Sequence, residues 1–229
     1  LVGSEMCIRD SPDTEPFALQ GDLSAMKPSN SLAHAPATRR NREPIFNVLQ
    51  TYLPDPARVL EIASGTGEHA VYLSSNLSQV VHWQPTDIDP TALSSIEARR
   101  QSDHHPKLFP ARLLDVTAPT EMPQGDYNTL LAINMIHIAP WQAAEGLMKL
   151  AQNLLSNDGV LFLYGPFWQA DVSPAESNLA FDASLRQRNP LWGIRHLDEV
   201  THLAKEQGLI RQAVVPMPAN NLSVVFRKE

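Results

Sequence analysis

Two acidic residues and two glycines form the clearest chemical pattern in this chain. Glu61 precedes Gly65 and Gly67, and Asp87 lies 20 positions beyond Gly67. Glycines permit a tight turn and let backbone amides approach a ligand closely. A carboxylate just before such a turn would repel a pyrophosphate and would attract an ammonium group. A second carboxylate at this spacing can accept hydrogen bonds from both hydroxyls of a ribose.

A ligand that joins adenosine to an amino acid meets both requirements, and S-adenosylmethionine is such a molecule. The pattern therefore predicts that these four residues bind this cofactor. Two other interpretations stay open. Gly65, Gly67 and Ala70 also fit a dinucleotide fingerprint, which would indicate a nicotinamide-dependent oxidoreductase. A plain strand-to-helix turn would explain the glycines without any ligand, and a helix cap would explain Asp87.

Further cofactor contacts are expected where other apolar runs end. Asp115 could accept a hydrogen bond from an adenine amino group while Val116 packs on the ring, although an exposed loop aspartate is an equal alternative. Asn134 ends a later apolar run and would lie beneath the cofactor, at the edge where reacting atoms meet. Ala63 and Ile88, which lie beside the two acidic motifs, complete the predicted cofactor set.

Two side chains are candidates for the chemical step. His137 follows the same apolar run as Asn134, and an imidazole can accept a proton near neutral pH. Tyr164 ends the next run and could hydrogen-bond an acceptor, while a packing role is the alternative for each. His69 is expected to point into solvent. His104 and His105 have no third ligand nearby, so no metal site is predicted.

The stretch 165–195 is too long for a simple connection, which favours a lid over the site. Its aromatic rings could form walls, and its arginines could bind a carboxylate or phosphate. The alternative is that the rings pack down and the arginines are solvated. Two residues near the first helix and two turn asparagines are further candidates, with capping and turn chemistry as their alternatives. The predicted substrate-binding residues are Asn41, Arg42, Arg188, Trp192, Asn220 and Asn221.

These residues need a sheet that brings the ends of several strands together. Apolar runs predict strands at 58–62, 80–84, 113–114, 127–133 and 160–164, and apolar spacing predicts helices at 45–52, 69–77, 90–100, 141–155 and 196–207. Such alternation predicts an α/β fold with a doubly wound, mostly parallel sheet and helices on both faces. Two last strands, 210–215 and 222–226, have a short connection and should be antiparallel. Ligands of such sheets bind at the carboxyl ends of the strands.

The composition limits the class of protein. The 229 residues include 18 basic and 25 acidic side chains, a net charge of −7, which predicts no general attraction to nucleic acid or anionic lipid. One cysteine excludes an intramolecular disulfide framework, and no apolar run is long enough for a membrane span. We predict a cytoplasmic protein with a single domain at 26–229. We interpret residues 1–25 as a leader that is non-native or disordered.

Eight segments resemble the methyltransferase-like protein twenty-six family, long labelled a domain of unknown function. They are RNREPI (40–45), VLEIASGTGEHA (59–70), WQPTDID (83–89), INMIH (133–137), YGPF (164–167), SNLAFD (177–182), RNPLWGIR (188–195) and MPANN (217–221). The resemblance implies the Rossmann-like class I methyltransferase fold, a seven-stranded sheet whose last strand is antiparallel. It also implies S-adenosylmethionine binding by Glu61, Gly65, Gly67, Asp87, Asp115 and Asn134.

Class I methyltransferases usually have Gly at the loop position that Ala63 occupies in this chain. The family that this chain resembles shares this departure from the usual loop. The resemblance identifies no methyl acceptor. We therefore predict an S-adenosylmethionine-dependent methyltransferase whose acceptor is a small molecule or an exposed protein side chain. A protein that holds the cofactor without turnover is the alternative, and the oligomeric state stays open.

Overall fold

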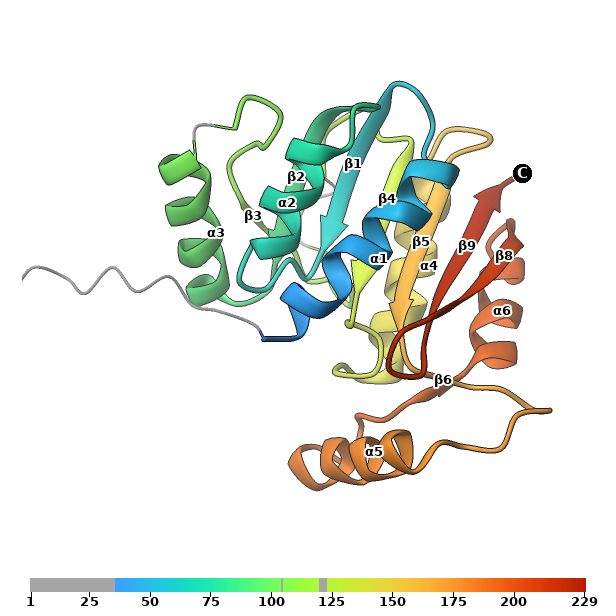
Figure 1. Ribbon diagram of the computed structural model, residues 1–229. Coiled ribbons are helices and arrows are strands. Elements are labelled where there is room, and N and C mark those ends of the chain that lie inside the picture. Colours follow the sequence, from blue (N-terminus) through green and yellow to red (C-terminus); the bar gives the residue numbers. More distant parts are fainter. Residues whose placement is uncertain (1–35, 104, 120–122) are drawn as a thin grey trace, which may run out of the picture. The chain divides into compact units, whose positions relative to one another are not determined.

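Seven strands of the computed structural model form one mostly parallel sheet, in the order β3-β2-β1-β4-β5-β9-β8 (Figure 1). The structure describes residues 36–103, 105–119 and 123–229. This strand order, with helices on both faces, confirms the predicted doubly wound α/β class. The strands are β1 (Ala57–Ile62), β2 (Val80–Asp87), β3 (Arg112–Leu113), β4 (Thr129–Ile133), β5 (Val160–Gly165), β8 (Leu209–Met217) and β9 (Asn221–Lys228).

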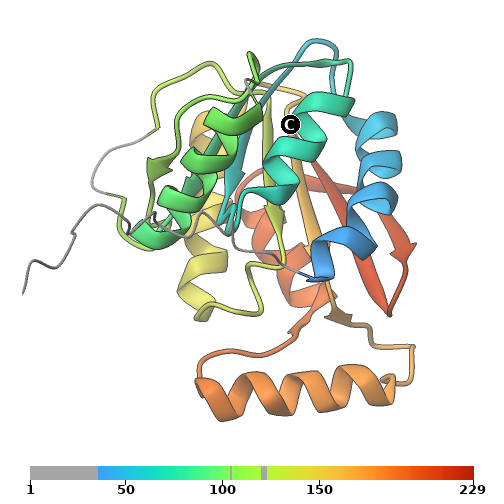
Figure 2. The same ribbon diagram turned by 60° about the vertical axis from the view of Figure 1, so that its left-hand side comes forward.

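Helices cover both faces of this sheet. On one face lie α1 (Pro36–Tyr52), α2 (Glu68–Asn76) and α3 (Pro90–Asp103), and on the other lie α4 (Trp141–Leu154) and α6 (Leu197–Glu206), as Figures 1 and 2 show. Every residue of β4 and β5 is buried, as expected for parallel strands between two helical layers. Neighbouring residues of β1 pack into opposite cores, Val59 on the α1 side and Leu60 on the α4 side.

The last two strands form an antiparallel hairpin, which confirms the expectation from their short connection. β9 pairs antiparallel with both β5 and β8, and Met217 lies opposite Asn221 at the turn. Ala219 and Asn220 in that turn have φ angles of 57° and 56°. A left-handed backbone of this kind matches the twist of a tight hairpin.

The stretch 165–195 contains a helix, α5 (Glu176–Arg188), that is not among the helices predicted from apolar spacing. The short strand β6 (Phe167–Trp168) precedes α5 and β7 (Arg195–His196) follows it, and these two strands pair in a separate two-stranded sheet. In both views α5 lies across the carboxyl ends of the parallel strands. Within α5 only Asn178 and Leu185 are buried, so its sequence carries little helical periodicity of apolar residues.

The first helix, α1, is longer at its amino end than the sequence predicts. It begins at Pro36 rather than near Ile45, so Pro44 lies inside it. Proline has no N–H, so the carbonyl of Arg40 loses its usual helical donor at this point. The prediction for residues 1–25 lies outside the described residues. Among the described residues, no helix has both the length and the apolar character needed to span a bilayer.

Candidate functional site

The loop between β1 and α2 is shaped by its glycines. The φ angle is 57° at Gly65 and 81° at Gly67, a region that favours glycine. A side chain at Gly67 would lie 3.0 Å from the Cα atom of Ile96 in α3. The Nε atom of Arg99, also in α3, donates to the Thr66 carbonyl at 2.9 Å. These contacts hold the loop at the N-terminus of α2, where the helix dipole favours electron-rich ligand groups.

Glu61, next to the last residue of β1, is a buried carboxylate with no paired cation among the described residues. Its side chain is only 1% exposed, and the indole Nε1 of Trp83 donates to its Oε2 at 2.9 Å. Burial is the main reason that the pKa of Glu61 rises from 4.5 to about 7. Hydrogen bonds from Trp83 and Ser64 lower this pKa, and the nearby charge of Asp87 raises it further. No ion pair among the described residues includes Glu61. A ligand ammonium would supply the missing positive charge.

Asp87 ends β2 and anchors the glycine loop. Its Oδ2 accepts from the backbone amide of Gly65 at 2.8 Å, and its Oδ1 accepts from that of Asp89 at 2.9 Å. The side chain is 7% exposed. Each carboxylate oxygen has a second lone pair, so both can still accept from a ribose diol. Glu61 and Asp87 thus lie on the adjacent strands β1 and β2, at their carboxyl ends.

An apolar cavity of about 290 Å³ lies beside these strand ends. Ile88, on its wall, is 58% exposed, which is unusual for a large apolar side chain next to a strand end. Asp115 lies on the same wall, where its Oδ1 accepts from both the amide and the hydroxyl of Thr117 at 2.8 and 2.6 Å. Four predicted cofactor residues line this cavity: Ala63, Ile88, Asp115 and Val116.

A second cavity of about 450 Å³, which we call the polar cavity, lies under α5. Ile138 borders both cavities. Asn134, predicted for the cofactor, lines the polar cavity at the end of β4, with a φ of 56°. The polar cavity is lined by Arg40, Asn41, Asn134, His137, Ile138, Tyr164, Pro166, Ser177, Asn178, Phe181, Pro218, Ala219 and Asn221.

His137 lines the polar cavity as a buried, neutral imidazole. It is 1% exposed, and its Nδ1 has no hydrogen-bond partner among the described residues. Burial and then the charge of Arg195 lower the pKa of His137 to about 4. The ring of Phe181 from α5 packs against it edge-on, with centroids 5.7 Å apart. The fold thus places this candidate residue on a cavity and leaves its buried Nδ1 without a partner among the described residues.

Tyr164 and Asn41 belong to a hydrogen-bonded chain that also includes His69. The Nε2 of His69 lies 2.8 Å from Oδ1 of Asn41, and because an amide oxygen only accepts, His69 is the donor. The expectation that His69 points into solvent is therefore wrong. Its partner is 28 residues away, a contact that no local pattern indicates. Burial raises the pKa of Tyr164, and a hydrogen bond from Asn41 offsets part of that rise.

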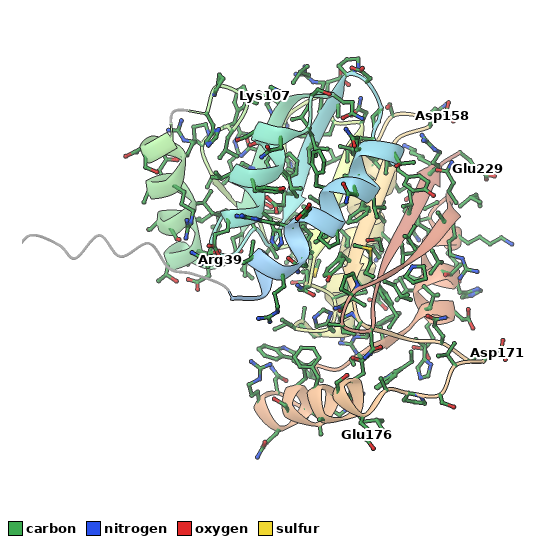
Figure 3. All side chains as sticks on the ribbon, viewed as in Figure 1. Arg39, Lys107, Asp158, Asp171, Glu176 and Glu229 are labelled. Atoms are coloured by element: carbon green, nitrogen blue, oxygen red, sulfur yellow. The ribbon has the colours of Figure 1, made fainter. Side chains whose placement is uncertain are left out.

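Hydrogen bonds tie the helix α5 to the hairpin turn and to the segment just before β7. Asn178 Nδ2 donates to the Asn220 carbonyl at 3.2 Å, and Asn220 Nδ2 donates to Ser177 Oγ at 3.1 Å. Asp182 Oδ1 accepts from the amide of Ile194 at 2.7 Å. These bonds fix α5 over the polar cavity, which is the position expected of a lid. In Figure 3, Glu176 at the start of α5 lies at the opposite edge of the sheet from Asp158 and Lys107.

Several residues predicted to bind the substrate do not line the polar cavity. Trp192 lines the apolar cavity rather than the polar one, and Arg188 stacks on its ring at 5.4 Å. Arg42 stacks on Tyr72 at 4.6 Å. Asn220 makes the hydrogen bonds to α5 described above and does not line the polar cavity. The other turn asparagine, Asn221, does line it. Both arginines thus have an aromatic partner, and neither lines the polar cavity.

One contributor to the site, Gly165, was missed from the sequence. A side chain at Gly165 would lie 2.7 Å from Cε1 and 3.0 Å from Nδ1 of His137, so this glycine makes room for the imidazole. The YGPF segment contains Gly165 and was the only local signal for it. Phe181, one of the aromatic rings of the stretch 165–195, supplies the aromatic contact to the same imidazole and lines the polar cavity.

No group of three or more His, Cys, Asp or Glu side chains in the described part of the chain could hold a metal ion. Of the two adjacent histidines considered in the sequence, His104 lies outside the described residues. His105 bonds through Nδ1 to the hydroxyl of Ser75 at 2.8 Å.

The sequence matches, over residues 32–228, the model of a family described as "Protein of unknown function (DUF938)". The chain belongs to this family. The description of this family assigns no activity, so the chemistry has to be inferred from the site itself.

Solved structures of methyltransferases share this fold. The S-adenosylmethionine-dependent methyltransferase SibL matches with a TM-score of 0.70 and 15% identity, over 84% of this chain and 55% of SibL. An O-methyltransferase family protein from Burkholderia thailandensis has the same TM-score, identity and coverage of this chain, and is matched over 57% of its own length. Human N-acetylserotonin methyltransferase in complex with S-adenosylmethionine matches with a TM-score of 0.67 and 13% identity, over 84% and 52% of the two chains.

This chain spans about half the length of those three structures. The likeness, together with the seven-stranded sheet and its antiparallel β9, identifies the class I methyltransferase fold predicted from the sequence.

Proposed function

We propose that this protein is an S-adenosylmethionine-dependent methyltransferase acting on a small-molecule acceptor. The observation that carries the proposal is the meeting of two unlike cavities at Ile138. One has apolar walls beside Glu61 and Asp87, and the other has hydrogen-bonding walls and His137. Ligands in the two cavities would be neighbours, as a methyl donor and its acceptor must be.

The residues of the first cavity fit the proposed cofactor. Glu61 is a buried carboxylate without a counter-ion, which suits the ammonium of the amino-acid part. Asp87 at the end of β2 suits the ribose diol. The apolar walls that contain Ile88 and Val116 suit the adenine, with Asp115 beside them as an acceptor for its amino group. When bound, the sulfonium of this cofactor supplies an electrophilic methyl group.

The chain's own residues would orient the acceptor and take up its proton. His137 lines the polar cavity, and its Nδ1, which has no hydrogen-bond partner among the described residues, would be the proton acceptor. Its pKa of about 4 means that it is neutral at pH 7 and therefore has a free lone pair. The Tyr164 hydroxyl and the Asn134 amide line the same cavity and can hold the acceptor in place. The helix α5 would separate this space from bulk water.

Calorimetry with S-adenosylhomocysteine and with NAD tests this proposal against the oxidoreductase alternative. We expect S-adenosylhomocysteine to bind at least tenfold more tightly than NAD. Preference for NAD would overturn the proposal. A protein that binds without turnover would hold S-adenosylhomocysteine yet form none of it from S-adenosylmethionine with any acceptor mixture. Formation of S-adenosylhomocysteine by the wild type and its loss in His137→Ala would exclude that alternative.

The eight sequence segments support kinship with methyltransferase-like protein twenty-six, which we include in the proposal. The cytoplasmic location and the lack of nucleic-acid binding stay predictions from the composition. An exposed protein side chain remains a second class of acceptor. We favour a small molecule because α5 lies across the carboxyl edge of the sheet where the acceptor must enter.

A further inference from the structure

The side chains that line the polar cavity carry a net positive charge. Among its lining residues Arg40 is the single ionised side chain, since His137 is neutral, and no carboxylate is present. Arg40 is exposed, and its guanidinium forms no hydrogen bond or ion pair with the described residues. By contrast, Arg99, Arg186 and Arg195 all bind oxygen atoms of the chain. A free guanidinium at a cavity is suited to a planar anion such as a carboxylate.

The other wall of the polar cavity offers both a proton donor and a proton acceptor. Tyr164 lines it, and while burial raises the pKa of the Tyr164 hydroxyl, a hydrogen bond from Asn41 lowers it. A hydroxyl that accepts one hydrogen bond still has its own proton to donate to a ligand. His137, whose Nδ1 has no partner among the described residues, supplies the complementary proton acceptor in the tautomer that leaves this nitrogen unprotonated. A ligand group that both accepts and donates, such as a hydroxyl, satisfies the two residues together.

The remaining walls favour a flat ring. Phe181, Ile138, Pro166 and Pro218 are the large apolar residues of the cavity. Phe181 already packs edge-on against the His137 ring. Aromatic groups of a ligand would add contacts of the same kind. A volume of about 450 Å³ accommodates a single substituted ring beside the end of a cofactor.

We propose that the acceptor site takes a small aromatic hydroxy acid, with its hydroxyl toward His137 and Tyr164 and its carboxylate toward Arg40. This inference rests on the proposed methyltransferase function for its reaction. The acceptor oxygen bonds to the methyl carbon as the carbon–sulfur bond breaks, and the electron pair of that bond neutralises the sulfonium. The hydroxyl proton passes to Nδ1 of His137 and then to solvent. The carboxylate takes no part in bond making and serves recognition.

Two matched probes test the charge at Arg40 without needing turnover. They are 3-hydroxybenzoate and its neutral counterpart 3-hydroxybenzamide, titrated by calorimetry into the full chain with and without saturating S-adenosylhomocysteine. We expect the acid to bind the wild type about 5- to 10-fold more tightly than the amide, the range for a charge-assisted bond at an exposed site. Arg40→Gln should reduce this preference to less than twofold, and Arg40→Lys should retain part of it.

Arg39→Gln is the matched control, because Arg39 is the preceding exposed residue of α1 and does not line the cavity. It should keep the wild-type preference. Equal binding of the two probes to the wild type, or a preference that survives in Arg40→Gln, would overturn the inference. Failure of S-adenosylhomocysteine to bind would instead overturn the proposed function. In that case, a preference for the acid that depends on Arg40 would still support an acid-binding cavity.

Discussion

Replacement of Glu61 by glutamine should stabilise the ligand-free protein and weaken cofactor binding at the same time. Glutamine has nearly the same shape, and its amide oxygen can still accept from the Trp83 indole. The change therefore removes the buried charge while the packing stays intact. A residue with a purely structural role would not give opposite effects on stability and binding.

The magnitude follows from the pKa of Glu61, which burial raises from 4.5 to about 7. Because the folded state holds this proton more tightly than the unfolded state, stability falls as pH rises from about 4.5 to about 7. The full cost of the ionised carboxylate is about 3 kcal/mol, at about 1.4 kcal/mol for each tenfold change in proton affinity. Glu61→Gln should therefore gain up to about 3 kcal/mol over the wild type at pH 8 and little at pH 4.5.

Binding should change in the other direction. The ammonium of S-adenosylhomocysteine pairs with an ionised Glu61, so wild-type affinity should fall by up to tenfold per pH unit below pH 7. The variant should show no such dependence and should bind about 10- to 100-fold more weakly at pH 8, the worth of a hydrogen bond to a charged group. Urea unfolding and calorimetry at pH 5 and pH 8 measure both effects.

Asp171→Asn is the matched control, since Asp171 is exposed and lines neither cavity. It should leave both quantities unchanged. The electrostatic interpretation of Glu61 is refuted if Glu61→Gln binds S-adenosylhomocysteine as tightly as the wild type at pH 8. It is also refuted if the stability difference between variant and wild type is the same at both pH values.

Three further variants test the rest of the site. Asp87→Ala should weaken S-adenosylhomocysteine binding by about 1–3 kcal/mol in calorimetry, the cost of leaving hydrogen-bonding partners unpaired, and unchanged affinity would place the ribose elsewhere. His137→Ala should keep that affinity within about twofold while slowing methyl transfer by roughly 10²–10⁴-fold. In the wild type the acid limb of the rate profile should lie near pH 4, where His137 gains its proton, so a limb near pH 6.5 would contradict the burial of this ring. Gly165→Ala should displace the His137 ring, which lies 2.7 Å from the added methyl, and should cost about 1–3 kcal/mol in denaturant unfolding. Full stability and activity of that variant would show that the ring has more room than the structure allows.

The sequence predicted the sheet and supplied the candidate cofactor residues because both depend on local patterns. Strand β4 is a continuous apolar run, and Glu61 and Asp87 are recognised by their spacing around the glycines. The acceptor side depends on contacts between distant parts of the chain. His69 meets Asn41 across 28 positions, and Asn178 meets Asn220 across 42. No spacing rule reports such contacts, so the sequence left these residues in turns, caps or solvent.

The surface helix α5 was incompletely predicted for a different physical reason. A helix on the surface of a core alternates apolar and polar faces, and α5 does not, since it faces a polar cavity on one side and solvent on the other. Leu179 is 51% exposed in this helix. The weak pattern is thus a consequence of the position of α5 over the polar cavity, where hydrogen bonds to the hairpin turn add to the burial of Leu185.

Backbone strain gathers at the same edge of the sheet. Five non-glycine residues have positive φ angles, among the residues that the structure describes, and Ala63, Asn134 and Ala219 line one of the two cavities. An alanine in this conformation costs roughly 1–2 kcal/mol, which hydrogen bonds of the neighbouring strands must offset. The amide of Asn134 donates to the Tyr164 carbonyl at 2.8 Å and so locks the end of β4 to β5. The strained residues are thereby held in place before any ligand arrives, which supports the assignment of both cavities to one preorganised site.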